Sequence, residues 1–510
     1  MLTFIVRRVL TGLGILLVSS FLMYLLVDFT IDPLKDLYQR TDPNKAFLIQ
    51  QRIDLLQLDK SSIERYFQWL GTLLTGDFGT AWRTGRPVAD LLQGAIISTL
   101  QLVSAATVLS IVLGVGIGIV SALRQYSSFD YLITFFSFLL YSLPSFWVAV
   151  LLKQWGAIGF NDFLREPVIG WAVLVAIGLV AGLLWSMALG GPARRRLIQG
   201  GLAALATVAV LAYIQFSNWW SEPNIGPILL TITSLAIAFT VTTLSTGLRD
   251  RRSLYTALTC AALGLALYYP LQYVFDYLTP FMSYGLAAVL GVLAALVGGV
   301  VGVLWRGPDW RQSARTGALT AVLVSMLIFV DRVMQVWVPY FDSNAISGRP
   351  IQTLGDRAPN LGGNFWVIVL DNYTHLLLPT LALMLISFAG YTRYARGSML
   401  EVMNQDYIRT ARAKGLTERT VVMRHGFRNS LIPLATIVPL DVITLVGGAL
   451  ITERIFGRPG MGQLFIQNLD DADIDPVMAY LVIVAFLAIL ANIVADLVYA
   501  ALDPRIRVNA

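Results

Sequence analysis

Long apolar runs, separated by short polar segments rich in basic residues, recur along the whole chain. Each run approaches or exceeds the ~20 residues that an α-helix needs to cross the apolar part of a bilayer. The runs lie near residues 9–27, 95–122, 131–158, 168–190, 197–216, 226–247, 254–270, 282–304, 317–338, 374–393, 433–452 and 478–500. The pattern predicts an all-α polytopic membrane protein with about twelve spans in a lipid bilayer.

Composition supports this prediction and excludes several other classes of protein. Hydrophobic residues make up 56% of the 510 positions and charged residues only 13%, which excludes a soluble multidomain protein. The net charge of +6 comes from basic residues in short loops, which we interpret as topology signals and not as a nucleic-acid surface. The single cysteine, Cys260, permits no intrachain disulfide. The two histidines, His375 and His425, lie far apart in sequence, which argues against a metal site.

The basic residues also orient the predicted spans. Arg7 and Arg8 precede the first apolar run and no small-residue cleavage site follows it, so we expect an uncleaved first span with its N-terminus inside. Alternation from this start places the dense basic clusters on the cytoplasmic side, and an even number of spans keeps them there. The clusters lie at residues 124, 194–196, 249–252, 306–315, 394–430 and 505–507. Both termini are therefore expected in the cytoplasm.

Residues 28–94, between the first two runs, are polar enough to fold outside the membrane. An Asp-Pro pair at 42–43 can start one helix. Ser61 and Glu64 have the spacing of a capping box before a second helix, which is expected to end near Gly76. These signals predict a small external helical subdomain.

The basic loop at 394–430 has an internal pattern that a solvated charge run lacks. With the residue that precedes it, the loop holds eight basic and three acidic residues. Asn404 is suited to cap a short helix, and Gly415 is suited to the left-handed residue that ends it. Thr417 is suited to cap a second helix, expected to extend to His425. The loop is predicted to be a helix, a glycine turn and a helix.

One side of the first helix in this loop is apolar. Tyr407, Ile408 and Ala411 fall on that side at helical spacing, while the basic residues point elsewhere. An exposed apolar stripe on a cytoplasmic loop needs a partner.

The loop resembles the coupling loop of importer-type ABC permeases, specifically the dipeptide/oligopeptide permease family. The core, TARAKG at 410–415, and the Leu-Ile-Pro entry into the next span at 431–433 carry the resemblance. Arg409 and Thr410 replace the first two residues of the generic Glu-Ala-Ala importer motif, and the spacing to Pro433 is longer; both differences favour the peptide branch. The resemblance implies that part of this loop contacts an ATPase and couples the permease to its motion. The residues are Tyr407, Ile408, Arg409, Thr410, Ala411, Arg412, Ala413, Lys414 and Gly415.

The same resemblance covers both ends of the chain. Residues 1–160 resemble the family's first three spans, including GDFG at 76–79 and SLPSFW at 142–147. Residues 371–510 resemble its last three, including FGRPGMG at 456–462. The resemblance implies a six-helix permease core built from spans 1–3 and 10–12.

Residues 161–370 depart from the family pattern and hold six additional apolar runs, which we interpret as three tandem helical hairpins. VAGLLW at 180–185 is echoed by VVGVLW at 300–305. Six inserted spans preserve the sidedness of the core. Asp331 and Arg332 are expected to form a local pair. We interpret the insertion as a peripheral packing or partner-docking module.

The sequence contains no phosphate-binding loop of the G-x-x-x-x-G-K-[ST] type. The chain is therefore expected to be no enzyme and to hold no cofactor, with ATP and Mg²⁺ bound by partner subunits. The resemblance implies two ATPase subunits or domains and an extracytoplasmic substrate-binding protein. Because two ATPases need two coupling loops and this chain has one, a second homologous permease subunit is also implied.

Two further features are candidates for a role in translocation. Asp441 lies in the middle of a predicted span, where an ionisable side chain faces either a cavity or a structural partner. A glycine-rich segment after that span is a candidate tight external turn or outer gate. Its residues are Gly457, Pro459, Gly460 and Gly462.

The implied function is transport of di- or oligopeptides across the cytoplasmic membrane of a prokaryote. The chain would be the permease of an ATP-driven importer that works by alternating access and is coupled to ATP hydrolysis through residues 404–425. Related permeases carry nickel, glutathione or glycans, which leaves those substrates as alternatives. A secondary transporter is an alternative of a different class. It would be expected to show a repeat between the chain halves and an ion-coupled carboxylate pair, whereas the repeat here is confined to the middle of the chain. A membrane scaffold that keeps the permease ends is a third alternative.

Overall fold

The chain is almost entirely helical. The computed structural model describes residues 2–39, 41, 43–305 and 310–502. Within these ranges the only strands are a short antiparallel ribbon, β1 (Thr80–Ala81) with β2 (Arg86–Pro87). Helices dominate because a bilayer offers no water to backbone N–H and C=O groups, and a helix satisfies them within one segment. The all-α, multi-pass prediction is confirmed.

Nine helices within the described ranges are long and apolar enough to cross a membrane, and two bent helix pairs raise the number to eleven. These eleven coincide with eleven of the twelve apolar runs. The twelfth run, 433–452, lies in α19 (Arg428–Ile455), which contains Pro433 and Pro439 and is not among the eleven. The structure therefore supports nine to eleven spans where the sequence predicts about twelve.

The run expected at 131–158 is one of the bent pairs. Its two helical segments, Ser128–Ser142 and Ser145–Arg165, meet at 102°. Pro144 explains the bend, because a proline disfavours helical geometry in the residue before it, and Leu143 is extended (φ −80°, ψ 133°). The elements are α6 (Ser128–Ser142), α7 (Ser145–Leu151), the π-helix η1 (Leu152–Gly159) and α8 (Phe160–Arg165).

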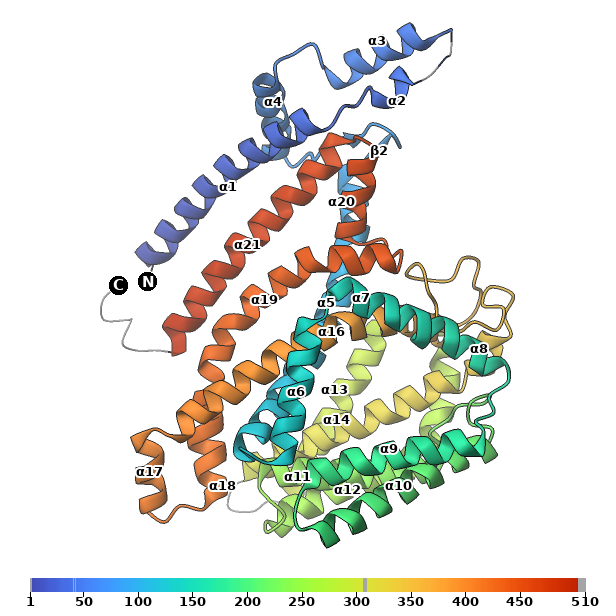
Figure 1. The fold of residues 1–510 in the computed structure, drawn as a ribbon, viewed down its shortest axis with the longest axis vertical. Coiled ribbons are helices and arrows are strands. Elements are labelled where there is room, and N and C mark those ends of the chain that lie inside the picture. Colours follow the sequence, from blue (N-terminus) through green and yellow to red (C-terminus); the bar gives the residue numbers. More distant parts are fainter. Residues whose placement is uncertain (1, 40, 42, 306–309, 503–510) are drawn as a thin grey trace.

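The N-terminal part holds four helices, which are α1 (Leu2–Thr30), α2 (Lys35–Tyr38), α3 (Lys45–Leu56) and α4 (Ser62–Leu74). Ser61 Oγ accepts a hydrogen bond from the Glu64 N–H at 3.3 Å, so the predicted cap of α4 is confirmed. Asp42 lies outside the described residues. Tyr66 of α4 is buried against α1 and α21 (Ile474–Leu502). Figure 1 shows this part at one end of the molecule.

Two long helices from opposite ends of the chain form the centre of the structure. α5 (Val88–Leu123) packs along much of α16 (Phe365–Met403). Gly114 and Gly118 permit this close approach, because a Cβ at Gly118 would meet the Thr392 carbonyl oxygen at 2.5 Å. α19 packs against both α16 and α21, and the short α20 (Met461–Asp470) joins α19 to α21 (Figure 1).

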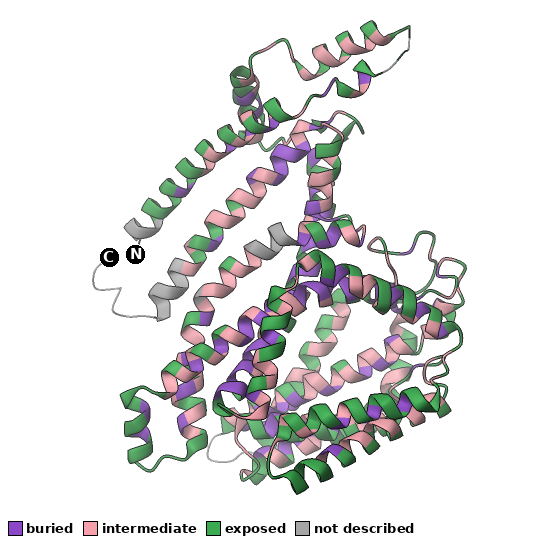
Figure 2. Cartoon of the chain, in the orientation of Figure 1, coloured by how far each residue is buried: buried purple, intermediate pink, exposed green. Residues whose placement is uncertain are grey.

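The six helices that the sequence assigns to an insertion, called the inserted helices below, pack in sequential pairs, and two small elements lie in the same part of the chain. The pairs are α9 (Trp171–Leu189) with α10 (Ala193–Phe216), α11 (Gly226–Ser245) with α12 (Arg251–Leu278), and α13 (Tyr284–Leu304) with α14 (Trp310–Met334). The small elements are the 3₁₀-helix η2 (Thr279–Phe281) and α15 (Trp337–Phe341). The two echoed segments have the same packing role: a Cβ at Gly182 would collide with Gly200, and one at Gly302 with Ser313. Figure 2 shows α9 and α10 with mostly exposed surfaces.

Candidate functional site

The basic loop forms a helix, a turn and a second helix, but its first cap differs from the prediction. α17 (Asp406–Ala413) begins after Gln405, which makes no side-chain cap. Asn404 instead ends α16: its backbone is still near-helical (φ −92°, ψ −4°), and its Nδ2 donates to the Leu400 carbonyl oxygen at 3.0 Å. A residue held in that geometry cannot adopt the extended backbone of an N-cap.

Gly415 makes the turn after α17. Its φ of +74° lies in the left-handed region, and no heavy atom lies within 4 Å of where a Cβ would be. The glycine is therefore required by backbone conformation and not by space. Thr417 Oγ1 accepts from the Thr420 N–H at 3.4 Å, which confirms it as the cap of the next helix.

The second helix of the loop is longer than predicted. α18 (Glu418–Thr420) continues into the π-helix η3 (Val421–Phe427) and then directly into α19. It does not end at His425: Gly426 follows inside the helix, where it fits closely against Met399 of α16 and has no room for a Cβ. From Glu418 onward the backbone is thus helical without a break into α19.

The apolar stripe on α17 finds its partner inside the loop itself. Ile408 and Ala411 are buried against Val421 of η3 and Met403 at the end of α16. Tyr407 does not join them: it is 42% exposed, and its hydroxyl accepts from Asn429 Nδ2 at 3.1 Å. The prediction of a shared three-residue stripe is therefore wrong for Tyr407, because its side chain points along the surface toward α19.

The outward side of α17 is charged. Arg412 donates two hydrogen bonds to Glu418, at 3.1 and 2.8 Å, and this pair spans the Gly415 turn. Hydrogen bonding to Arg412 holds the pKa of Glu418 below its usual range. Arg409 lies 3.5 Å from Asp406 within the same helix. All four side chains are exposed, so these pairs orient the turn and add little to stability.

The loop also contacts the inserted helices. Arg419 donates to the Thr243 carbonyl oxygen at 2.7 Å and to the carbonyl oxygen of Thr246, at the C-terminal end of α11. A cation is favourable there because the last carbonyl groups of a helix have no partner in the helix. The sequence carries no signal for this contact, since 173 residues separate Arg419 from Thr246.

An ion pair links the base of the loop to the other half of the core. Arg396 of α16 donates to both carboxylate oxygens of Asp130 in α6, at 2.6 and 2.8 Å, and Ser121 of α5 donates to Asp130 at 2.6 Å. One turn away on α16, the Arg393 guanidinium lies 3.8 Å from the ring centre of Tyr141. These contacts tie the base of the loop on α16 to α5 and α6.

Comparison with known proteins identifies what this arrangement belongs to. A family model described as the binding-protein-dependent transport system inner membrane component matches residues 287–508. The oligopeptide transport system permease protein OppB of Mycobacterium bovis is 38% identical over 229 residues, which are 45% of this chain and 70% of that protein. The chain belongs to this family of inner membrane components.

Two other relatives have similar descriptions. The dipeptide transport system permease protein DppB of Escherichia coli is 38% identical over 235 residues, covering 42% of this chain and 68% of that protein. The oligopeptide transport system permease protein AppB of Bacillus subtilis is 46% identical over 138 residues, covering 27% of this chain and 44% of that protein. The chain is thus a multi-pass inner membrane permease of a bacterial ABC system and not a catalytic component; this family generally works with an ATPase and a binding protein.

The permease holds Asp441 in α19, half-buried and facing the hydroxyl of Tyr391 in α16. Neither Asp441 Oδ2 nor the Tyr391 hydroxyl has a hydrogen-bond partner among the residues that the structure describes. Asp441 and Tyr391 thus face each other between α19 and α16, so the carboxylate has a structural partner within reach inside the core.

The glycine-rich segment forms a tight turn in which Gly460 and Gly462 are buried, Gly457 is half-buried and Pro459 is exposed. Gly457 has φ +57°, and the next turn of chain places Gly460 and Gly462 against the Glu453 carboxylate. Glu453 Oε2 accepts from the Gly462 N–H at 2.7 Å, and Oε1 accepts from Thr99 Oγ1 of α5 at 2.6 Å. Glu453 therefore holds the start of α20 against α5. Sequence reasoning missed Glu453, although a carboxylate at the end of an apolar run is a signal that could have found it.

Asp331 and Arg332 do not pair with each other, contrary to the expectation. Asp331 is fully buried and accepts from the Ile225 and Gly226 N–H groups, at 2.7 and 3.1 Å, and from the Tyr268 hydroxyl at 2.7 Å. Arg332 pairs with Asp276 of α12. Adjacent residues on a helix point about 100° apart, so neighbours in sequence find different partners.

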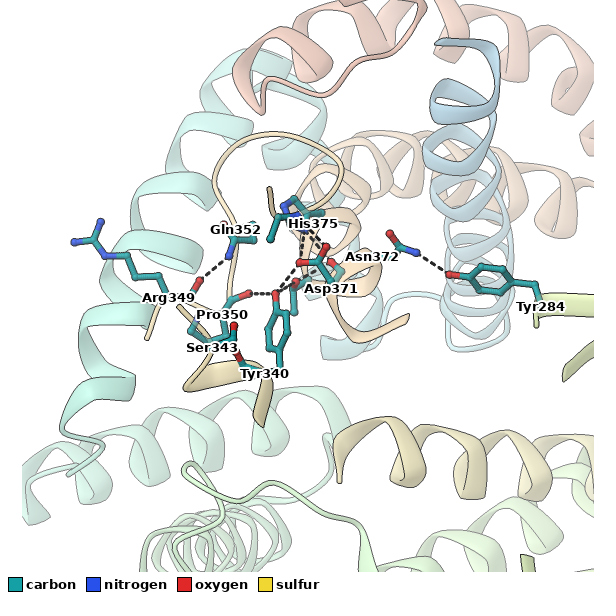
Figure 3. Close-up of polar contacts among 11 residues, drawn as sticks. Tyr284, Tyr340, Ser343, Arg349, Pro350, Gln352, Asp371, Asn372 and His375 are labelled. Carbon is teal, nitrogen blue, oxygen red and sulfur yellow. Dashed lines mark hydrogen bonds and ion pairs between the residues drawn. The ribbon is translucent and has the colours of Figure 1, made fainter. Parts of the chain in front are cut away.

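A second buried polar cluster joins the insertion to the permease core. The Tyr340 hydroxyl of α15 lies 2.8 Å from Thr374 Oγ1 and 3.1 Å from Asp371 Oδ1, both on α16. His375 Nδ1 lies 2.8 Å from the Asp371 carbonyl oxygen. The Tyr340 hydroxyl also donates to the Pro350 carbonyl oxygen at 3.3 Å. Figure 3 shows Tyr340, Asp371 and His375 pointing toward one another. The cluster fixes the segment after the last inserted helix to the start of α16.

Proposed function

We propose that this permease imports di- or oligopeptides and that residues 404–425 couple it to an ATPase. The observation that carries the proposal is the build of α17. Its apolar side is sealed by Val421 and its charged side faces outward. A left-handed glycine turns the chain toward a second helix, which continues from Glu418 into α19 without a break. A short rigid helix of this kind suits a cleft in a soluble partner. The similarity to oligopeptide and dipeptide permeases supports the substrate class.

The coupling step follows from the helix connections. Closure of an ATPase around nucleotide would displace α17, and η3 would pass the displacement to α19 without an intervening loop. The same displacement would move the end of α16 and, through the pair of Arg396 with Asp130, the ends of α5 and α6. These four helices surround the centre of the core, so their rearrangement would alternate access between the two sides.

The proposed assembly contains partners for this chain. Two ATPase subunits or domains would bind ATP and Mg²⁺, and a second homologous permease would offer them the other coupling loop. An extracytoplasmic binding protein would deliver the peptide. We propose residues 1–160 and 371–510 as the core, with 28–94 as its external helical part and 161–370 as the inserted module.

Asp441 is proposed to line the path of the substrate. Its carboxylate, half-buried in the core opposite the Tyr391 hydroxyl, would bind the ammonium group of a peptide as it passes. The turn that contains Gly457, Pro459, Gly460 and Gly462 is proposed as part of the outer gate, because it holds α20 against α5.

The experiment that tests the function is purification of the tagged chain in mild detergent, followed by reconstitution of everything that co-elutes. We expect ATPase subunits and a second permease to co-elute, and we expect peptide to stimulate both ATP hydrolysis and uptake into vesicles. Stimulation by nickel, glutathione or a glycan and not by peptides would replace the substrate class. Uptake driven by an ion gradient without any ATPase would contradict the proposal as a whole.

A further inference from the structure

A cavity of about 550 Å³ lies among three of the inserted helices. Its wall consists almost entirely of hydrocarbon side chains from α12, α13 and α14, with one residue, Tyr373, from α16. Ser325 on the wall is already satisfied, because its Oγ donates to the Val322 carbonyl oxygen at 2.9 Å. A cavity lined in this way binds an apolar ligand and offers nothing to a peptide or an ion.

The cavity arises from the way in which the three helices meet. α12 is bent by 55° between Ala266 and Tyr268, close to Pro270. α13 and α14 close tightly at Gly298, where a Cβ would collide with the Gly317 carbonyl oxygen. Farther along α13 the contact opens, and no heavy atom lies within 4 Å of a Cβ built on Gly291. The cavity therefore follows from the backbone arrangement of the three helices.

The dimensions of the cavity match one leaflet of a bilayer. The part of α13 that lines it extends from Ala287 to Gly298, which is about 16 Å of helix. The hydrocarbon core of a bilayer is about 30 Å thick, so the chains of one leaflet extend over about 15 Å. Lining residues at the rim, such as Leu293 and Met326, are 50% and 59% exposed and open the cavity toward the surrounding lipid.

We propose that this cavity binds one acyl chain of a bilayer phospholipid. The hydrocarbon wall, the length of one leaflet and the rim open to the membrane identify the occupant. The bound chain contacts Tyr373 of α16, the helix that ends at the basic loop, so the site places a lipid against the permease core. This role goes beyond peptide transport and does not depend on the identity of the transported substrate.

The test uses the full-length chain in its complex, reconstituted in vesicles that contain a phospholipid with a photoactivatable diazirine in its acyl chain. After illumination, mass spectrometry locates the labelled residues. We expect labelling of Val297 and Met326 at least about fivefold above that of Leu202 and Leu205, which are exposed on α10 outside the cavity. Equal labelling of the two sets, or none in the cavity because a protein segment fills it, would overturn the proposal.

Two glycine substitutions on α13 supply a matched pair. Gly291 lines the cavity and Gly299 does not, yet both have open space for a Cβ and lie in the same helix. Gly291→Leu is expected to reduce the cavity labelling at least about fivefold, whereas Gly299→Leu leaves it at the wild-type level. Unchanged labelling in Gly291→Leu would overturn the proposal, and the wild-type comparison decides the question if that variant does not fold.

Discussion

Replacement of Gly415 by valine tests the coupling loop most directly. The residue has φ +74°, a conformation that costs an L-residue with a Cβ about 1–2 kcal/mol. A β-branched side chain is still less suited to it. No heavy atom lies within 4 Å of the Cβ position, so the Cβ itself meets no collision, and the main effect of the substitution is on backbone conformation. A cost of this size lowers the population of the native turn about five- to thirtyfold.

The loss of the turn is expected to leave ATP hydrolysis running while transport fails. α17 would keep its helix, but its orientation relative to α19 would no longer be set. The assay is substrate uptake per ATP hydrolysed by the complete complex in proteoliposomes. We expect this ratio to fall at least about fivefold in Gly415→Val. The matched control is Gly415→Asn, because asparagine adopts the left-handed conformation more readily and should retain most of the ratio. A wild-type ratio in Gly415→Val would refute the reasoning.

Three further predictions concern buried carboxylates. Glu453→Ala would remove the acceptor of the buried Thr99 hydroxyl and of the Gly462 N–H, at a cost of about 1–3 kcal/mol each. The midpoint of thermal unfolding should therefore fall clearly in Glu453→Ala and less in Glu453→Gln. An unchanged midpoint would contradict the role of Glu453. Asp473 is buried directly before α21, and burial raises its pKa from 3.8 to about 7. Its contribution to stability is therefore complete below pH 3.8 and is lost as the pH rises through about 7. The midpoint of the wild type should therefore fall more between about pH 5 and about pH 8 than that of Asp473→Asn, and parallel profiles would exclude this assignment. Asp331→Ala would leave the N–H groups at the start of α11 unpaired, and hydrogen exchange there should accelerate. Protection equal to that of the wild type would contradict the role of Asp331 in holding the start of α11.

Local signals were sufficient where the structure depends on neighbours in sequence. Ser61 and Thr417 cap helices as predicted, and Gly415 adopts the left-handed turn, since each is decided by hydrogen bonds or backbone sterics within a few residues. Asn404 shows the limit of such signals. Its side chain suits a cap, but whether it begins one helix or ends another depends on how far α16 extends, and packing against α5 sets that length.

The contacts that define the candidate site could not be read in this way. Arg419 reaches α11 and Glu453 reaches Thr99 across more than 170 and 350 residues, respectively. No periodicity records which helices become neighbours, because an apolar face is satisfied equally well by lipid or by any other apolar face. Tyr407 likewise has the spacing of the buried stripe of α17, but the Asn429 side chain that its hydroxyl contacts is 22 residues away and is not indicated by that spacing.

By itself, the amino-acid sequence determined that this protein is a helical membrane protein, approximately where its helices lie, and that its basic loop turns at a glycine. These properties follow from the cost of unpaired backbone groups in hydrocarbon and from local sterics, both of which act residue by residue. Only the tertiary structure decided that the Ile408 side of α17 is sealed from within, that Arg419 connects the loop to α11, and that α12 to α14 leave a cavity one leaflet long. Those features depend on which helix surfaces meet in three dimensions. Bends such as the one near Pro270 change the direction of a helix and therefore change which surfaces it contacts.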